Sequence, residues 1–285
     1  MTQPTYSVSW ILPYVRRALN GVGNLNFNQY LGNLWLQLEK DQIADAQRHT
    51  IHTGTPGQII WDGAPLGLRN AATEAFFYLF RIGFISPQPP SGHPNHPNFD
   101  RYDVTLRGIE WAKGNEPLPE DIAGYMKFLH HRIPHLDAVV EQYVTDGLIA
   151  FERGAYFAAA VMLGAASEKT IYLLGDAMIG ALKSQKSKQA LEQHLKGRSL
   201  NSLFTFIRDV LDRNRKTPNI PYDGAITHLM SLFEAVRTQR NDAVHPTTGQ
   251  VSADSVRLLA ASFPYALGKG EELRTWLTAN LNCLD

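Results

Sequence analysis

The chain has 285 residues, of which 44% are hydrophobic and 19% are charged, and its formal net charge is zero. This composition allows a sizeable buried core and excludes wholesale disorder, while any site for a polyanion must come from a local cluster of basic residues. The single cysteine, Cys283, excludes an internal disulfide and zinc sites built on CxxC pairs, and it favours a reducing, cytoplasmic setting.

The residues before about position 115 are predicted to mix helices with short strands. The first 14 residues lack the basic-then-apolar layout of a signal peptide. Apolar spacing indicates helices over 14–19, 27–39 and 66–80. Extended segments are expected over 58–61 and 101–105, and within 81–85 Gly83 is expected to stop a helix before a strand. Five prolines mark residues 86–98 as a loop, and a short helical turn is expected over 106–111.

Residues 66–113 resemble part of a winged-helix domain. They give a helix, a strand, a long loop and a second strand, followed by the pattern Tyr-x-Val-Thr-x-x-Gly from Tyr102 to Gly108. In winged-helix domains the two strands and their loop form the wing, and Thr105 and Gly108 would close it. The helices before this segment show no clear helix-turn-helix. The resemblance implies a small α+β domain over residues 1–115 that can contact DNA.

The rest of the chain is predicted to be a helical bundle. Residues 116–134, which begin with Pro117 and Pro119, are expected to form a linker or connecting helix, and the bundle covers 135–285. Its apolar run at 155–166 is much shorter than the roughly 20 residues that span a bilayer, so we interpret it as a buried helix. Helices are expected over 137–151, 154–182, 187–211, 224–240 and 252–281, the last capped by Ser252.

The motif that carries the functional hypothesis is Arg-x4-His, from Arg240 to His245, with Asn241 directly after the arginine. It stands at the end of one predicted helix and before another. His245 is expected to lie outside both helices, because Pro246 disfavours helical backbone at the residue before it. An Ala-rich helix that contains Glu168 precedes it in the same bundle. Together these features resemble the HEPN superfamily of all-α domains, whose signature is Arg-x4–6-His. The resemblance covers about residues 135–285, so the expected class is a mainly α protein with a HEPN-like bundle and a winged-helix-like domain.

This resemblance implies metal-independent cleavage of RNA by a homodimer, in which the ribose 2′-hydroxyl attacks the adjacent phosphate. His245 would act as general acid or base, and Arg240 would hold the phosphate. Asn241 would orient the substrate or His245, and Glu168 would tether Arg240 or the imidazole. The residue types suit these roles, because histidine titrates near neutral pH and arginine offers a rigid fork of donors to phosphate oxygens.

Each of these residues also has a structural interpretation, in which Arg240 or Asn241 caps a helix end and Glu168 is simply an ion-pair partner. A ribonuclease acting as a toxin or anti-phage effector is the first hypothesis. The alternatives are a non-catalytic dimeric regulator that binds nucleic acid or a nucleotide, and a structural subunit of a defence complex. No membrane and no cofactor is expected. The pair His131 and His135 has the spacing of metal ligands, but Pro134 interrupts the helix, and no metal is expected.

A second candidate interface lies between Lys183 and Lys216, where nine basic residues stand against three acidic ones. This local excess can seat a phosphate backbone, or it can be only a solvated helix face. The residues expected to contact nucleic acid are Lys183, Lys186, Lys188, Arg213, Arg215 and Lys216.

Overall fold

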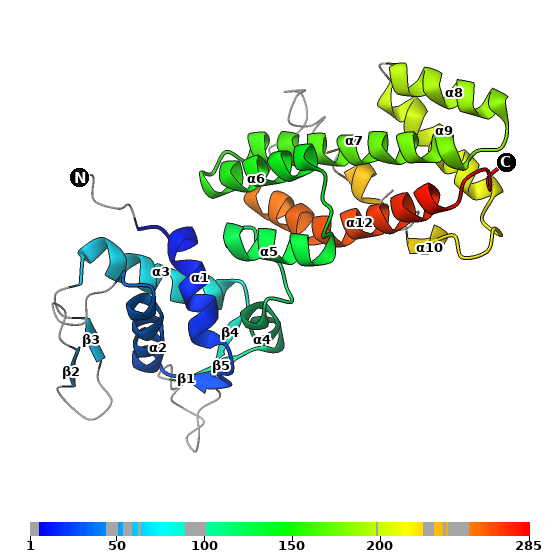
Figure 1. Cartoon of the computed structure of the whole chain (residues 1–285). Coiled ribbons are helices and arrows are strands. Elements are labelled where there is room, and N and C mark those ends of the chain that lie inside the picture. Colours follow the sequence, from blue (N-terminus) through cyan, green and yellow to red (C-terminus); the bar gives the residue numbers. More distant parts are fainter. Residues whose placement is uncertain are drawn as a thin grey trace. The chain divides into compact units, whose positions relative to one another are not determined.

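A computed structural model gives the chain many helices and a few short strands (Figure 1). The chain divides into two compact units, Met1–Phe128 and Leu129–Asp285. The border lies inside helix α5 (Ile122–Arg132), not in the proline-containing segment before it. The prediction of a mainly α protein is confirmed. The structure describes residues 6–43, 51–53, 59–61, 64–88, 101–197, 199–224, 231–235, 238 and 251–285.

The first unit packs helices against a small antiparallel sheet. Helix α1 contacts α2, α3 and α4, and the sheet has the strand order β1-β5-β4, while β2 and β3 pair with each other. The elements are α1 (Val8–Leu19), β1 (Asn24–Leu25), α2 (Phe27–Lys40), β2 (Ile51–Thr53), β3 (Ile59–Trp61), α3 (Leu66–Arg81), β4 (Ile85–Pro87), β5 (Tyr102–Val104) and α4 (Leu106–Lys113).

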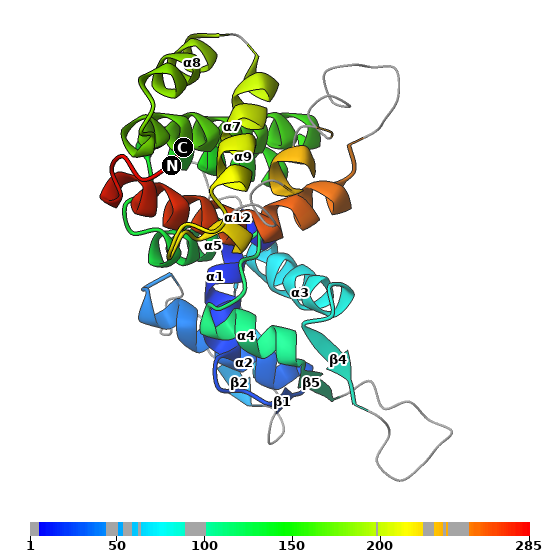
Figure 2. The same cartoon turned by 90° about the vertical axis from the view of Figure 1, so that its right-hand side faces the viewer.

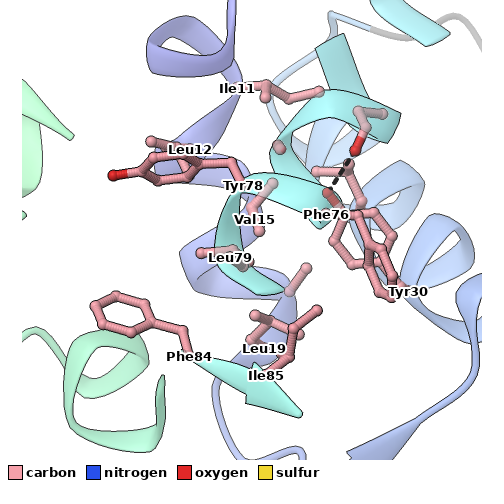
Figure 3. Close-up of a cluster of buried hydrophobic side chains, with 14 of the residues drawn as sticks. Ile11, Leu12, Val15, Leu19, Tyr30, Phe76, Tyr78, Leu79, Phe84 and Ile85 are labelled. Atoms are coloured by element: carbon pink, nitrogen blue, oxygen red, sulfur yellow. Dashed lines mark hydrogen bonds between the residues drawn. The ribbon is translucent and has the colours of Figure 1, made fainter. Parts of the chain in front are cut away.

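The core of this unit is a cluster of apolar side chains from α1, α2 and α3 (Figure 3). Leu12 of α1 is fully buried, and Phe76 of α3 is 1% exposed. Tyr30 of α2 is buried beside them, and its hydroxyl donates to the carbonyl of Ala72 at 2.9 Å. Burying one such side chain contributes roughly 1.5–3 kcal/mol. The packing of this cluster therefore fixes the three helices against one another.

The helix expected over 14–19 is longer than predicted. Helix α1 begins at Val8, where the side chain of Ser7 accepts the N–H of Trp10 at 3.1 Å, and it continues through Pro13. The added turn buries Ile11 and Leu12. Their burial offsets the backbone hydrogen bond that proline removes from a helix.

The transition expected within residues 81–85, in which Gly83 stops a helix before a strand, is found in the structure. Helix α3 continues to Arg81, and β4 begins only at Ile85. Between them Gly83 has a φ of +76°, and the N–H groups of Gly83 and Phe84 donate to the carbonyls of Phe80 and Leu79 at 3.1 and 2.9 Å. This closing motif needs a left-handed residue, so Gly83 is confirmed as the helix stop.

Thr105 links this turn to the sheet and to helix α4. Its hydroxyl donates to the carbonyl of Gly83 at 2.7 Å and accepts the N–H of Gly108 at 3.2 Å, which caps α4. Gly108 in turn lies directly against the carbonyl of Phe84. The two residues singled out in the sequence, Thr105 and Gly108, therefore hold β4, β5 and α4 together.

A buried carboxylate lies near the end of the first unit. Asp121 is 1% exposed, and its carboxylate is 3.2 Å from Nε of Arg16 and accepts the N–H of Gly124 at 2.9 Å. Burial raises the pKa of Asp121, and this effect outweighs the opposite effects of Arg16 and of the hydrogen bond from Gly124.

This shift predicts a pH dependence of stability. Because the folded-state pKa lies above the unfolded value of about 3.9, the stabilising contribution is complete below about pH 4 and is lost as the pH rises through the folded pKa. We expect wild type to gain stability relative to Asp121→Asn when the pH falls from 7 to 4. Urea unfolding followed by tryptophan fluorescence measures this, because four of the five tryptophans belong to the first unit. A constant difference across this range contradicts the prediction.

The second unit is a bundle of helices in which α7 contacts α6, α8, α9 and α12 (Figure 2). Its elements are the end of α5, then α6 (Ala138–Glu152), α7 (Tyr156–Ala181), α8 (Gln185–Lys196), α9 (Leu200–Arg213), α10 (Tyr222–Gly224) and α12 (Ala253–Ala279). Ser252 is confirmed as the cap of α12, since its side chain accepts the N–H of Ser255 at 3.1 Å. Of the helix expected over 224–240, residues 231–235 are helical, and most of the others lie outside the described residues.

The single helix expected over 187–211 is wrong, because the structure has two helices there. Helix α8 ends before Gly197, and α9 begins after Ser199, whose side chain accepts the N–H of Ser202 at 3.3 Å. The break lets both helices turn an apolar face inward. Leu191 of α8 and Leu203 of α9 are fully buried in one cluster with residues of α7.

Helix α7 is long and apolar enough to cross a membrane by length and composition, and among the described residues no other helix is. Half of its most apolar window is buried inside the protein, where α7 contacts α6 and α12. This packing is that of the central helix of a bundle, as expected for residues 155–166.

Candidate nucleic-acid interface

The residues of the predicted catalytic motif, Arg240, Asn241 and His245, lie outside the described residues. Their geometry therefore remains a prediction. The fourth residue, Glu168, is half-buried on α7. It lies on the central helix of the bundle, which contacts both α6 and α12.

The segments that carry the six basic residues predicted to bind nucleic acid, the start of α8 and the end of α9, lie at one end of the second unit near residues 282–285 (Figure 1). Lys183, Lys186 and Lys188 come from the turn between α7 and α8 and from the first turn of α8. Arg213, Arg215 and Lys216 come from the end of α9 and the turn after it. We call these six residues the basic cluster.

The last residues of the chain join the two halves of the basic cluster. Asn214, between Arg213 and Arg215, is 8% exposed; its amide donates to the carbonyl of Asp285 at 3.0 Å and accepts the N–H of Asp285 at 3.0 Å. The Asp285 carboxylate lies 3.1 Å from Nζ of Lys183. Residue 284 pairs with residue 182, and Leu284 is fully buried. The basic cluster is thus fixed in place by tertiary contacts.

The members of the basic cluster differ in what they can offer a ligand. Lys183 pairs with Asp285, and Nζ of Lys188 donates to Asn282 at 3.1 Å, so both help to hold the end of the chain. Lys186, Arg215 and Lys216 are exposed and pair with no carboxylate in the part of the chain that the structure describes. These three cations are available to phosphate oxygens.

Asp212, an acidic residue of α9 close in sequence to Arg213 and Arg215, is hydrogen-bonded to another residue. The hydroxyl of Tyr222 forms a short hydrogen bond with the carboxylate of Asp212, and this bond is the main cause that raises the pKa of Tyr222. Asp212 therefore has a partner other than the basic cluster. The surface keeps its local positive charge, although the whole chain is neutral.

A second feature of this unit is a groove of about 580 Å³ between residues 231–235 and one face of α12. We call it the α12 groove. Its floor is a stripe with three- and four-residue spacing, Leu258, Ser262, Tyr265 and Lys269. Leu258 is 75% exposed although it is a leucine. The described lining contains no acidic residue, and apolar atoms dominate it.

Arg132 lies at the border of the α12 groove. Its guanidinium stacks over the ring of Tyr265, 4.6 Å from the centroid, and its stem crosses Gly268 so closely that a Cβ there would lie 2.8 Å from Nε. A glycine inside a helix destabilises it by about 1 kcal/mol relative to alanine. Gly268 therefore makes space for Arg132 but lowers the stability of α12. No carboxylate pairs with Arg132 among the described residues, whereas Lys269 pairs with Glu272 at 2.8 Å.

A smaller cavity of about 140 Å³ offers a comparison. It also contains an arginine, Arg274, but both guanidinium contacts go to Glu271 at 2.7 and 2.5 Å. This hydrogen-bonded pair raises the pKa of Arg274, with Asp137 adding to the effect. An arginine that is already neutralised in this way has little to offer an anion, so the α12 groove is the better candidate site.

The histidines considered as metal ligands are His131 and His135. Within the described residues no group of three or more histidine, cysteine, aspartate or glutamate side chains is placed to hold a metal ion. Nε2 of His130 lies 3.1 Å from the carboxylate of Glu141, which makes a local pair across two helices.

Sequence reasoning missed the α12 groove. The stripe on α12 was visible in principle, because its spacing repeats along a helix that the sequence predicts. Arg132 was not visible, because it is far from Tyr265 in the sequence and only tertiary packing brings the two together.

Comparisons of this chain with protein-family models, with curated protein sequences and with solved structures give no significant match. No family can therefore be assigned from relatives. Function has to be inferred from the residues and from the geometry of the two units.

Proposed function

We propose that the second unit is a metal-independent endoribonuclease of the HEPN type. The observation that carries the proposal is the position of Arg240–His245 in the chain. The motif begins five residues after Ala235 and ends before Ser255, and both of these residues line the α12 groove of a mainly helical unit. The basic cluster on the same unit supports RNA as the substrate, because exposed cations favour a phosphate backbone.

In this proposal the chain itself supplies all the chemistry. His245 takes the proton of the ribose 2′-hydroxyl or gives one to the leaving 5′-oxygen, and Arg240 stabilises the charge that builds on the phosphate oxygens. Asn241 orients the substrate or the imidazole, and Glu168 tethers one of the two functional groups. The products are a 2′,3′-cyclic phosphate and a 5′-hydroxyl. We propose that two copies pair to complete the site and that the enzyme works in the cytoplasm.

The test is cleavage of single-stranded RNA by the purified full chain in the presence of a chelator. We expect wild type to cut and His245→Ala to lose the activity, with cyclic phosphate ends on the products. Arg153→Gln is a suitable control, because Arg153 is exposed on the same unit at the end of α6. Cleavage that survives His245→Ala, or that requires a divalent metal, contradicts the proposal. RNA binding without cleavage would favour a non-catalytic regulator or a subunit of a defence complex.

We propose a second function for the first unit, which is contact with DNA in the manner of a winged-helix domain. The strand order β1-β5-β4 around α1, α2 and α3 supports it, since the β4–β5 pair corresponds to the wing. Arg69 and Asn70 are exposed on α3, the helix that would enter the major groove. Duplex binding that weakens steeply with salt and with Arg69→Gln, but not with Lys113→Gln on α4, would support this function. Binding insensitive to Arg69 contradicts it.

A further inference from the structure

We propose that the α12 groove is the docking site for an amphipathic helix of a partner protein, whose inner face is apolar and whose edges carry acidic residues. The α12 groove is lined by Arg132, by residues of the helical segment 231–235 and by one face of α12. None of these residues belongs to the Arg240–His245 motif, so the proposal does not depend on the ribonuclease.

The length of the α12 groove suits a short helix. The residues of α12 that line it run from Ser255 to Lys269, a rise of about 21 Å at 1.5 Å per residue. A partner helix of about 14 residues has the same length. Its apolar stripe would contact both α12 and the helical segment 231–235, which is how grooves between helices bind amphipathic helices.

Two large apolar side chains of α12 remain exposed in the α12 groove. Leu258 is 75% exposed and Tyr265 is 39% exposed, and both line the groove. They are seven residues apart, which places them two turns apart on the same face of the helix. One exposed leucine is ordinary on a protein surface, whereas two large apolar side chains in one groove indicate a binding surface. Apolar residues of a partner helix at the same spacing would cover both.

The charges that line the α12 groove are complementary to an acidic partner. Among the described lining residues only Arg132 and Lys269 are charged, and both are basic. The guanidinium of Arg132 is positioned over the ring of Tyr265 at 4.6 Å, and it pairs with no carboxylate of the described residues. Lys269 pairs with Glu272 at 2.8 Å, and exposed pairs of this kind are weak. A carboxylate of the partner would therefore gain a bidentate contact with Arg132, and a basic partner would be repelled.

The same properties disfavour an RNA strand as the occupant. Affinity for a strand rises with the number of phosphates that lysine and arginine neutralise. The described lining offers one guanidinium without a carboxylate beside it, and apolar atoms dominate the rest. Exposed cations gather instead in the basic cluster, at Lys186, Arg215 and Lys216. The α12 groove is thus suited to a polypeptide and the basic cluster to a polynucleotide.

The experiment selects peptides on the full chain and then maps where they bind. A displayed library of random peptides of about 14 residues, the length of the groove, is selected on immobilised wild type. We expect the enriched peptides to carry net negative charge and to repeat apolar residues at intervals of three and four. The best of them is synthesised with a fluorescent label, and its Kd is measured by anisotropy.

A charge reversal at Arg132 tests the acidic contact. Arg132→Glu should weaken the selected peptide by about tenfold or more, as for loss of a hydrogen bond to a charged group. A peptide in which lysine replaces the acidic residues should bind Arg132→Glu more tightly than wild type, which a misfolded groove could not do. Arg153→Glu, at an exposed arginine after α6, is the matched control and should change either affinity by less than about twofold.

A second variant, Leu258→Glu, tests the apolar contact. It replaces an exposed side chain, so we expect the far-UV circular dichroism and melting temperature to be unchanged. The charge that it places in the groove should weaken the selected peptide by about tenfold or more. Leu281→Glu makes the same change at an exposed leucine outside the groove, and it should leave the affinity within about twofold of wild type.

Several results would overturn the proposal. They are the absence of enriched peptides, the enrichment of basic peptides, and affinities that neither Arg132→Glu nor Leu258→Glu changes. A wild-type dimer that Leu258→Glu converts to a monomer, in place of peptide binding, would assign the groove to a second copy. Binding of a six-nucleotide oligoadenylate in the His245→Ala background that both variants abolish would assign it to RNA. RNA cleavage enters none of these readouts, so failure here is distinguishable from failure of the ribonuclease proposal.

Discussion

Replacing Gly108 with alanine should destabilise the first unit by about 3 kcal/mol or more. A Cβ at this position would lie 2.1 Å from the carbonyl oxygen of Phe84 and 2.9 Å from a methyl group of Val104. The first contact is with backbone, so no side-chain rotation can relieve it. Helix propensity acts in the opposite direction, because alanine is favoured over glycine in a helix by about 1 kcal/mol. A loss of unfolding free energy in Gly108→Ala therefore shows that the close packing dominates, and a gain shows that helix propensity dominates.

The measurement is urea unfolding followed by tryptophan fluorescence, which reports mainly on the first unit. Gly23→Ala is the matched control, since a Cβ at Gly23 would meet no atom within 4 Å. We expect the control to stay within about 0.5 kcal/mol of wild type. If Gly108→Ala is as stable as the control, or more stable than wild type, α4 does not approach the Phe84 carbonyl as closely as described.

Replacing Leu284 with alanine should destabilise the second unit by about 2–5 kcal/mol. The side chain is fully buried in a cluster with Ile171, Leu174 and Leu211. The backbone around it is also engaged, because Lys183 donates its N–H to the carbonyl of Leu284 at 2.9 Å. The loss combines transfer of apolar surface with a cavity that its helical neighbours cannot fill.

The matched control for this prediction is Leu281→Ala, which removes the same atoms from the same segment, residues 280–285, which we call the tail. Leu281 is 64% exposed, so its loss should cost less than about 0.5 kcal/mol. Denaturant unfolding followed by circular dichroism at 222 nm compares the two, because helices make up most of the described residues of the second unit. Equal effects of the two substitutions would show that the tail does not close the bundle.

The position of the tail affects how nucleic-acid binding can be tested. Substitutions at Lys183 or Lys188 would remove contacts to Asp285 or Asn282 and so change stability together with charge. Arg215 and Lys216 are exposed and have no such role in the described residues. Variants at Arg215 and Lys216 therefore test the basic cluster without loosening the end of the bundle.

Local sequence signals predicted the helices well. The ends of α3 and α12 follow from apolar spacing and from Gly83 and Ser252, whose contacts lie within a few residues of themselves. The same signals failed where burial overrides them. Pro13 stays inside α1 because Ile11 and Leu12 are buried, and the apolar spacing over 187–211 hid the break at Gly197.

The strands and the candidate sites depended on contacts between distant parts of the chain. Strand β1 has only two residues and pairs with β5, whose residues 102 and 103 are far from it in the sequence. A two-residue strand has no periodicity of its own, so the sequence did not predict it.

By itself the sequence determined the helical class, most helix boundaries and the residues that form the Arg-x4-His motif. Backbone preferences, caps and apolar spacing act over a few residues, and they can be recognised along the chain. Only the tertiary structure decided that Arg132 stacks on Tyr265 and that Asp285 joins Lys183 to Asn214. The physical reason is that these partners are chosen by the packing of whole helices, which bury one common core and thereby fix which distant surfaces meet.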